Sequence, residues 1–314
     1  MIGRRRIAGS TVVVVGATSG IGRATALSLA ACGAGLVLSA RDEDDVDDVV
    51  AACRTYGADA IGVAGDLADP SLSERIVGQA SEHFGSIDTW INAASALIVG
   101  DLVDQPTADI SRLVDTNVLG TAFASRVALE HFRAQGHGVL VNVGSLLAIV
   151  PNPLVPTYVM SKFAIRGLSL SLHEATAGTA VRVCTVLPGP VDTPMFQHAA
   201  NYSGRRIRAI PPAASAERAA AAILRSVRRP RRQRTVGLSG ATIVVFHHVI
   251  PRLVESVVAR AAAALVVERQ PGPSSPGALA DPGGLATVSG GWRRGSTRRR
   301  LGDAVGRLTA RWAA

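Results

Sequence analysis

Tyr158 and Lys162 form the pair of residues in this chain that is best suited to chemistry. The sequence holds 33 basic residues, and Lys162 is its only lysine. A lysine among arginines indicates a position that needs a compact ammonium, which the planar guanidinium of arginine cannot replace. Because four positions separate Tyr158 from Lys162, a helix places both side chains on one face as neighbours. A nearby cation lowers the pKa of a phenol, and such a pair can exchange a proton with a carbonyl or alcohol oxygen. The alternative is an ordinary helix with a core tyrosine and a solvated lysine.

A glycine-rich loop near the N-terminus indicates a dinucleotide site. Residues 11–15 form a β-branched run that predicts a buried strand, and residues 23–31 have the apolar spacing of a helix. Gly16, Gly20 and Gly22 lie between them. Glycines in such a turn let the backbone approach a pyrophosphate, and the helix N-terminus favours its negative charge.

The residue after the second predicted strand bears on the choice of cofactor. Residues 36–39 predict that strand, and it ends at Ala40 and Arg41. An acidic residue there would hold the ribose 2′-hydroxyl of NAD, whereas an arginine accommodates the 2′-phosphate of NADP. Ala40 leaves the acidic place empty and Arg41 supplies the cation, so the sequence favours NADP over NAD. The acids at positions 42, 44 and 45 are expected in a solvated first helical turn.

Further strands alternate with helices along the chain. Strands are predicted at residues 60–65, 87–91, 139–143 and 181–187, and helices at 70–84, 106–133 and about 157–177. The helix at 106–133 is interrupted near Asn117, and Thr157 is expected to cap the helix that carries Tyr158. This alternation predicts an α/β fold, a doubly wound parallel sheet covered on both faces. Ser145 follows the strand at 139–143, at the edge of the sheet where ligands bind. The Ser145 hydroxyl is therefore either a catalytic group or a group that closes a turn.

At this point residues 8–230 resemble the short-chain dehydrogenase/reductase family in its single-domain Rossmann form. Gly16, Gly20 and Gly22 match the glycine motif of that family, and Asn92 with Ala93 matches its Asn-Ala-Gly motif. Asn117, Ser145, Tyr158 and Lys162 match its catalytic tetrad in order and spacing. Two residues depart from the pattern, since Val15 replaces a threonine and Ala94 a glycine. Ser19 stands where some members carry a second basic residue, so the NADP preference rests on Arg41.

The resemblance implies a mechanism. NADPH gives a hydride to a carbonyl carbon, Tyr158 exchanges the proton, and Lys162 lowers the phenol pKa and binds the nicotinamide ribose. Ser145 polarises the substrate oxygen, and Asn117 holds a water that links Lys162 to solvent. The implied cofactor-binding residues are Gly16, Thr18, Ser19, Gly20, Ile21, Gly22, Arg41, Asp66, Leu67, Asn92, Ala93, Tyr158, Lys162, Pro188, Gly189, Val191 and Thr193. No metal is expected.

Composition divides the chain into two parts. Residues 1–200 hold 13 basic and 19 acidic residues, and residues 201–314 hold 20 and 5. The first part is typical of a cytoplasmic enzyme domain, and three cysteines without metal spacing indicate buried thiols in a reducing compartment. The N-terminal basic and apolar residues lead directly into the glycine loop, so we do not interpret them as a signal peptide. No apolar run reaches the ~18 residues of a membrane span.

We therefore expect a Rossmann domain at 1–235, an amphipathic helical extension at 236–269 and a disordered Pro/Gly-rich and Arg-rich tail at 270–314. The extension could contact an anionic membrane, cap the substrate cleft or pack in a homo-oligomer. His247 and His248 lack further ligands in range and predict a surface pair. No nucleic-acid partner is expected, because the tail lacks an aromatic stacking pattern.

The whole pattern predicts an NADP(H)-dependent oxidoreductase acting on a ketone, an aldehyde or a secondary alcohol. Apolar residues at 146–156 and at 195–196 suggest an apolar substrate, although simple loop packing explains them equally. Two alternatives remain. One is a non-catalytic NADP(H)-binding protein that docks through its basic tail, and the other is an NAD-dependent alcohol dehydrogenase of the same family.

Overall fold

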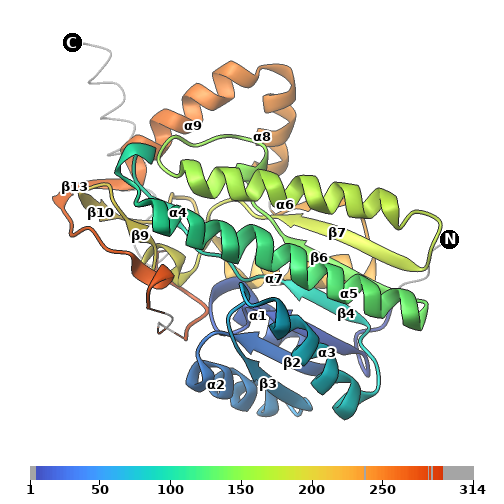
Figure 1. The fold of residues 1–314 in the computed structure, drawn as a ribbon. Helices are drawn as coiled ribbons and strands as arrows, with labels where there is room; N and C mark the ends of the chain where they lie inside the picture. The colour runs from blue at the N-terminus through green and yellow to red at the C-terminus, as the bar shows by residue number, and fades with distance from the viewer. Residues whose placement is uncertain (1–4, 237, 282, 284–285, 293–314) are drawn as a thin grey trace, which may run out of the picture.

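The computed structural model describes residues 5–236, 238–281, 283 and 286–292. A parallel sheet of seven strands lies at the centre of the described chain, in the order β12-β7-β6-β4-β1-β2-β3 (Figure 1). Its strands are β1 (Thr11–Val15), β2 (Gly35–Ala40), β3 (Ala60–Ala64), β4 (Thr89–Asn92), β6 (Gly138–Val143), β7 (Val181–Leu187) and β12 (Gln233–Thr235). The order reverses between β1 and β4, so the carboxyl ends of these two strands flank the switch point where ligands bind in such sheets. The predicted doubly wound fold is confirmed.

Helices cover both faces of the sheet. One face carries α1 (Gly20–Ala30), α2 (Glu43–Arg54) and α7 (Ala216–Arg228). The other carries α3 (Pro70–Phe84), α5 (Thr121–Gln135) and α6 (Pro156–Ala175). Helix α4 (Thr107–Val114) continues into α5 through a π-helical turn at Asp115–Gly120. The interruption that the sequence predicts near Asn117 is this turn.

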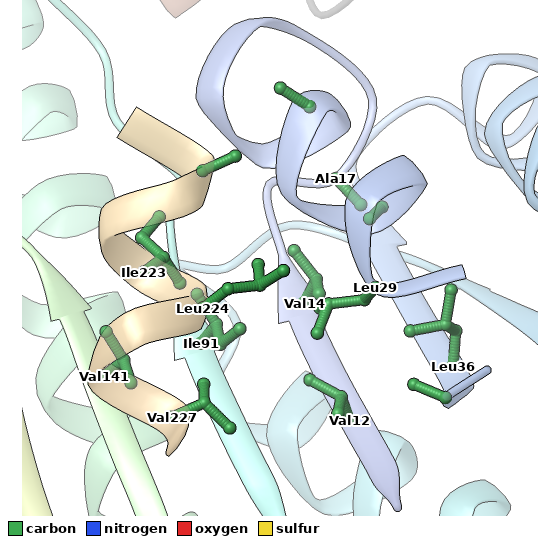
Figure 2. Packing of buried hydrophobic residues seen from close by; sticks show 14 of the residues in the cluster. Val12, Val14, Ala17, Leu29, Leu36, Ile91, Val141, Ile223, Leu224 and Val227 are labelled. Carbon is green, nitrogen blue, oxygen red and sulfur yellow. The ribbon is translucent and has the colours of Figure 1, made fainter. Parts of the chain in front are cut away.

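The alternation of side chains along β1 builds two cores. Val12 and Val14 point to the face of α1 and α7, where they join Leu29 and Ile223 (Figure 2). Val13 and Val15 point to the opposite face and join the cluster of α3 and α5. Because both faces are covered, the whole strand is apolar, and all five residues are buried.

Three two-stranded pairs stand beside the central sheet, at the ends of loops that surround the switch point. They are β5 (Ile98–Val99) with β9 (Ala200–Asn201), β8 (Val191–Asp192) with β11 (Ala214–Ser215), and β10 (Arg205–Ile207) with β13 (Val267–Pro271). The last pair joins the loop after β7 to the segment beyond residue 266. The C-terminal extension is thereby attached to the same side of the molecule as the loops.

The extension begins as two helices, α8 (Leu238–Val249) and α9 (Pro251–Leu265). Figure 1 shows them as an orange pair beside α6. Ile243, Val244, Val254 and Val258 pack on a cluster that includes Leu146 and Leu187. Of the three roles considered for the extension, capping the cleft is the one that this packing supports.

Three details differ from the sequence-based expectations. The basic run before residue 235 contains edge strand β12, which pairs with β7. Thr157 does not cap α6, because Pro156 is already its first residue and the Thr157 hydroxyl donates to Gln105. The described part of the tail at 270–314, which was expected to be disordered, forms the end of β13, the 3₁₀ turn Gly277–Leu279 and defined contacts at 286–292. Residues 293–314 lie outside the described chain.

Candidate active site

Tyr158 and Lys162 lie on one face of α6, as their spacing predicts. Both are buried, and the Lys162 ammonium stands 5.3 Å from the centre of the Tyr158 ring. The Nζ atom donates to the Val143 carbonyl at 3.4 Å, at the end of β6. Ser145 follows that strand and makes a side-chain hydrogen bond with the phenol of Tyr158. The Ser145 hydroxyl also accepts from the Leu147 backbone at 3.1 Å, so it closes a turn and contacts the phenol at once.

Burial controls the protonation of this pair. Desolvation raises the pKa of Tyr158 to about 12, although hydrogen bonds with Ser145 and Ser95 oppose the shift. Desolvation also lowers the pKa of Lys162 to about 8. The pKa of the phenol stays above its ordinary value with the Lys162 ammonium nearby, because the desolvation of Tyr158 is the largest effect. At neutral pH the phenol is therefore protonated, the state in which it can donate a proton.

Asn117 stands in the π-helical turn, where it connects the segment after β4 to helix α6 and does not line the cleft. Its Oδ1 accepts from the Ala96 backbone at 2.8 Å, and its Nδ2 donates to the Ala96 carbonyl at 3.0 Å and to Ser161 Oγ at 3.1 Å. Ser161 precedes Lys162 on α6. Asn117 therefore fixes the segment after β4 against the helix that carries the tyrosine and the lysine.

The glycine loop after β1 is tight. Gly16 has φ +81°, and a Cβ on it would lie 2.4 Å from the Ala94 nitrogen. A Cβ on Gly22 would lie 1.8 Å from the Gly16 carbonyl. Side chains at these two positions would force the loop apart, so its glycines are required by close approach. The loop leads into the N-terminus of α1, the positive end of the helix dipole, which favours an anion.

Charged residues cluster where β2 and β3 end. Arg41 donates to the Ala278 carbonyl at 2.6 Å, and Arg112 of α4 pairs with Asp66. Burial disfavours the Asp66 carboxylate, but hydrogen bonds from Arg112 and Ala68 outweigh burial and hold its pKa below the usual value. Desolvation and the charge of Arg112 lower the pKa of Arg41. Arg112 is a residue that sequence reasoning missed, because no motif marks it.

Asn92 belongs to a buried polar network behind the cleft. Its side chain accepts from Trp90 Nε1 at 2.8 Å and donates to Asn142 Oδ1 at 2.9 Å and to Ser125 Oγ at 3.2 Å. Asn142 donates onward to Ser169 of α6. The network connects β4, β6 and α6, and it supports the cleft without lining it.

A single cavity of about 740 Å³ brings the predicted residues together. It is lined by Gly16, Thr18, Ser19, Gly20, Ile21, Gly22, Arg41, Asp66, Leu67, Ala93, Ser145, Tyr158, Lys162, Pro188, Gly189, Val191 and Thr193. Asn92 and Asn117 are not among its lining residues and act from behind. The cavity therefore runs from the charged cluster at Arg41 to the phenol of Tyr158.

Apolar side chains line the part of the cavity beyond Tyr158. Leu146, Val150 and Leu154 come from the loop before α6, and Met195 and Phe196 come from the loop after β7. Helices α8 and α9 complete this wall with Ile243, Phe246, Ile250, Leu253, Val254, Val257, Val258 and Ala261. The sequence suggested that the two loops could contact an apolar substrate. For the extension that contains α8 and α9 it left three roles open: contact with a membrane, a cap on the cleft or packing in a homo-oligomer.

No described helix is both long and apolar enough to cross a membrane. Among the same residues, no group of three His, Cys, Asp or Glu side chains could hold a metal ion. His247 instead contacts Glu255 at 3.0 Å, and His248 contacts the Val244 carbonyl.

Comparison with known proteins defines the class of this fold and site. Residues 10–203 match the family model described as short chain dehydrogenase. The chain belongs to this family and is an oxidoreductase that acts on alcohol or carbonyl groups. An uncharacterized oxidoreductase of Bacillus subtilis, YxnA, is 32% identical over 259 residues, which cover 80% of this chain and 72% of that protein.

The names of two further similar proteins mention a nicotinamide cofactor. The L-rhamnose 1-dehydrogenase (NAD(P)(+)) of a Sphingomonas species is 33% identical over 187 residues, or 59% of this chain and 74% of that enzyme. The crystal structure of a short chain dehydrogenase from Burkholderia cenocepacia in complex with NADP superposes with a TM-score of 0.64. That structure is 28% identical and covers 74% of this chain and 98% of its own. Binding of NAD or NADP is thus a property of neighbours in fold and sequence.

Proposed function

We propose that the chain is an NADP(H)-dependent oxidoreductase that interconverts a ketone or aldehyde with the matching alcohol, in the cytoplasm. One observation carries this proposal. A continuous cavity places the glycine loop and Arg41 at one end and Ser145, Tyr158 and Lys162 further along. Such a cleft can hold a long dinucleotide with one end at the proton donor.

The residues present fit a nicotinamide dinucleotide. The Lys162 ammonium is buried, and its recorded acceptor, the Val143 carbonyl, lies at the long distance of 3.4 Å. A buried ammonium with so weak a partner is costly, and ribose hydroxyls would supply the missing acceptors. At the other end, Arg41 lines the cavity and provides a cation for a phosphate, which supports NADP. Asp66 is already paired with Arg112. The cofactor, when bound, supplies or accepts the hydride.

The side chains of this protein handle the proton and the substrate oxygen. Tyr158 is protonated at neutral pH because burial raises its pKa to about 12, so it can donate to a carbonyl oxygen. The Ser145 hydroxyl holds the same oxygen and polarises it. Loss of the phenolic proton leaves a phenolate near the Lys162 ammonium, which stabilises that charge. Asn117 and Asn92 keep α6 in register with β4 and β6 through the contacts described above.

The substrate side of the cleft supports an apolar carbonyl compound. Leu146, Met195 and Phe246 come from three separate segments and converge on the cavity beyond the phenol. Removing an apolar ligand from water into such a pocket contributes about 25 cal/mol per Å² of buried surface. A polyhydroxylated substrate would find few partners there.

The experiment compares turnover of NADPH and NADH on a panel of ketones and aldehydes of increasing chain length. We expect oxidation of NADPH, faster with longer apolar carbonyls, and slower oxidation of NADH. Faster turnover with NADH would favour the NAD-dependent alternative. Tight nucleotide binding without turnover of any carbonyl would favour the non-catalytic binding protein.

We also propose that α8 and α9 contact an anionic membrane surface. Val245, Val249 and Leu253 are 63%, 73% and 58% exposed, and Leu253 also lines the cavity mouth. Exposed Arg252 and Arg260 accompany them, whereas the acid of these helices, Glu255, already contacts His247. An apolar face beside cations is typical of a helix pair lying on anionic lipid.

Sedimentation with vesicles tests this contact. Wild-type protein should bind vesicles that contain phosphatidylglycerol and should not bind pure phosphatidylcholine. A double variant, Val245→Asp with Val249→Asp, should lose binding, because neither residue lines the cavity and both are exposed. Val103→Asp changes a side chain that is 88% exposed elsewhere and should leave binding unchanged. Equal binding by all three proteins contradicts the proposal. If the double variant instead changes the mass in light scattering, the face belongs to a homo-oligomer.

A further inference from the structure

Residues 286–292 lie over the junction of the glycine loop and the loop after β7, beside the cavity. The Gly20 backbone N–H, at the start of α1, donates to the Thr287 carbonyl at 2.9 Å. Trp292 Nε1 donates to the Thr193 carbonyl at 3.0 Å, beyond the end of β8. Gly20 and Thr193 both line the cavity and are neighbours, since a Cβ on Gly20 would lie 3.0 Å from the Thr193 Cβ. The segment thus bridges the glycine loop and the loop after β7.

Asp192 holds this segment in place. Its carboxylate is only 4% exposed and accepts from Ser289 Oγ at 2.9 Å and from the Trp292 backbone at 3.0 Å. A buried carboxylate without donors is costly, so release of the segment exposes or unpairs Asp192. Gln197 adds a further hydrogen bond by donating to the Gly290 carbonyl at 2.8 Å.

Apolar contacts and close packing complete the attachment. Val288 packs against the cluster that contains Ile21, and the rings of Trp292 and Phe196 meet edge to face with their centres 6.4 Å apart. A Cβ on Gly290 would lie 2.4 Å from the Thr193 carbonyl. The backbone of the segment therefore lies directly on the loop that it covers.

A second part of the extension lines the cavity beside Arg41. Ala278 and Leu279 line the cavity, and the Ala278 carbonyl holds the Arg41 guanidinium. Leu279 is buried against Ile98 and Leu113. Arg41 is therefore oriented by a residue far along the chain, and the same extension reaches both the Arg41 end and the glycine loop.

From these contacts we infer that residues 286–292 form a strap that retains the bound dinucleotide, and that the cofactor exchanges only when the strap releases Asp192 and Thr193. The inference rests on the proposed function, because it requires that the cavity binds NADP(H). The cavity keeps a volume of about 740 Å³ with the strap in place and remains lined by residues 18–22. Residues 286–292 are not among the lining residues, so the strap holds two of the loops that line the site together without filling it. Its residues are positioning residues for the cofactor and take no part in the proton transfer.

The test measures the rate at which NADPH leaves the full-length protein, by stopped-flow fluorescence after a chase with excess NADP⁺. Gly290→Ala places a Cβ against the Thr193 carbonyl and should release the strap. We expect NADPH to dissociate at least about fivefold faster, the factor that loss of one hydrogen bond supplies. The KM for NADPH should rise while kcat and the KM for the carbonyl substrate stay unchanged. Gly78→Ala is the matched control, because a Cβ there meets nothing within 4 Å in α3.

A second variant keeps the inference testable if Gly290→Ala folds poorly. Ser289→Ala removes one donor to Asp192 and should raise the dissociation rate in the same direction. Unchanged or slower NADPH release in both variants would overturn the strap. A rise confined to the association rate would overturn it as well, because the segment would then compete with the cofactor. If the wild-type protein binds neither nucleotide, the proposed function fails, and that outcome is distinct from these.

Discussion

The Lys162 ammonium lies over the ring of Tyr158, 5.3 Å from its centre, and the phenolic oxygen makes its hydrogen bonds with Ser145 and Ser95. In this arrangement the cation and the hydrogen-bond partners contact different parts of the tyrosine side chain. The cation interacts with the ring face, and the serine hydroxyls act on the oxygen. Because burial dominates, the phenol keeps its proton and the ammonium is easily neutralised. The free protein is therefore prepared to protonate a carbonyl oxygen.

Tyr158→Phe should remove the proton donor and leave the fold intact. The phenyl ring fills the same buried space, so NADPH affinity should remain within about fivefold of the wild type, because one hydrogen bond is worth only about 1 kcal/mol. We expect kcat for carbonyl reduction to fall about 10²- to 10⁴-fold, the contribution of a positioned acid. Steady-state kinetics and a fluorescence titration measure the two quantities. A variant that retains a tenth of wild-type kcat or more would contradict the assignment of Tyr158 as the acid.

Lys162→Met should stabilise the protein while it abolishes activity. The pKa of Lys162 is about 8 in the folded protein against 10.5 when solvated, so the buried ammonium destabilises the fold. That difference corresponds to about 3 kcal/mol. The penalty is fully present below pH about 8 and disappears as the pH approaches 10.5, because the unfolded chain then also loses the proton.

Urea unfolding without cofactor measures this effect. The free energy of unfolding of Lys162→Met should exceed that of the wild type at neutral pH, and the gap should narrow between pH 8 and pH 10. Arg126→Met changes an exposed cation, 74% accessible, and should show neither effect. A gap that stays constant with pH would mean that the titration of Lys162 is not its cause.

The pH dependence of carbonyl reduction should follow the titration of Lys162 and not that of Tyr158. The phenol remains protonated up to a pKa of about 12, whereas the ammonium is lost through a pKa of about 8. We expect kcat/KM for the carbonyl to be level below this pH and to fall above it, because a neutral amine no longer stabilises the developing phenolate. Oxidation of the alcohol should rise with pH, since it requires removal of the phenolic proton. A reduction rate that is level through pH 10 would exclude this role of Lys162.

Arg41→Ala should change the preference between the two nucleotides. A charged hydrogen bond to a phosphate contributes about 1.5–3 kcal/mol, so NADPH affinity should drop about ten- to hundredfold. NADH affinity should change much less, because NADH lacks the 2′-phosphate. Arg126→Ala is the control, and an unchanged NADPH to NADH ratio in Arg41→Ala would overturn the assignment of NADP.

The residues that line the cleft were easier to predict from the sequence than the hydrogen-bond networks that hold those residues in place. Ser145 and Tyr158 were predicted because strand ends and helical spacing are local patterns, and both line the cavity. Asn92 and Asn117 were predicted to serve the cofactor and the proton path. The structure places them in hydrogen-bond networks behind the cleft, with Asn142 and Ser161 as partners. No local pattern specifies such partners, because they come from distant parts of the chain.

The C-terminal elements escaped prediction for the same physical reason. Strand β12 has three residues in an arginine-rich run and exists because it pairs with β7. Residues 286–292 show no periodicity, and their place comes from hydrogen bonds to Asp192 and Thr193. Arg112 pairs with Asp66 across 46 positions. Contacts at such separation depend on the completed fold, so composition suggested disorder where the chain has defined partners.

The helical wall of the cleft should determine how long a substrate the enzyme accepts. Val254 lies on α9, lines the cavity and packs against the cluster around Leu146. Val254→Ser removes apolar contact of about 1–2 kcal/mol, so the KM for a long-chain ketone should rise about tenfold. The KM for a short ketone that does not reach α9 should be unchanged. Val249→Ser is the matched control, because Val249 is 73% exposed and does not line the cavity. Equal effects on short and long ketones would indicate that the substrate does not extend to this wall.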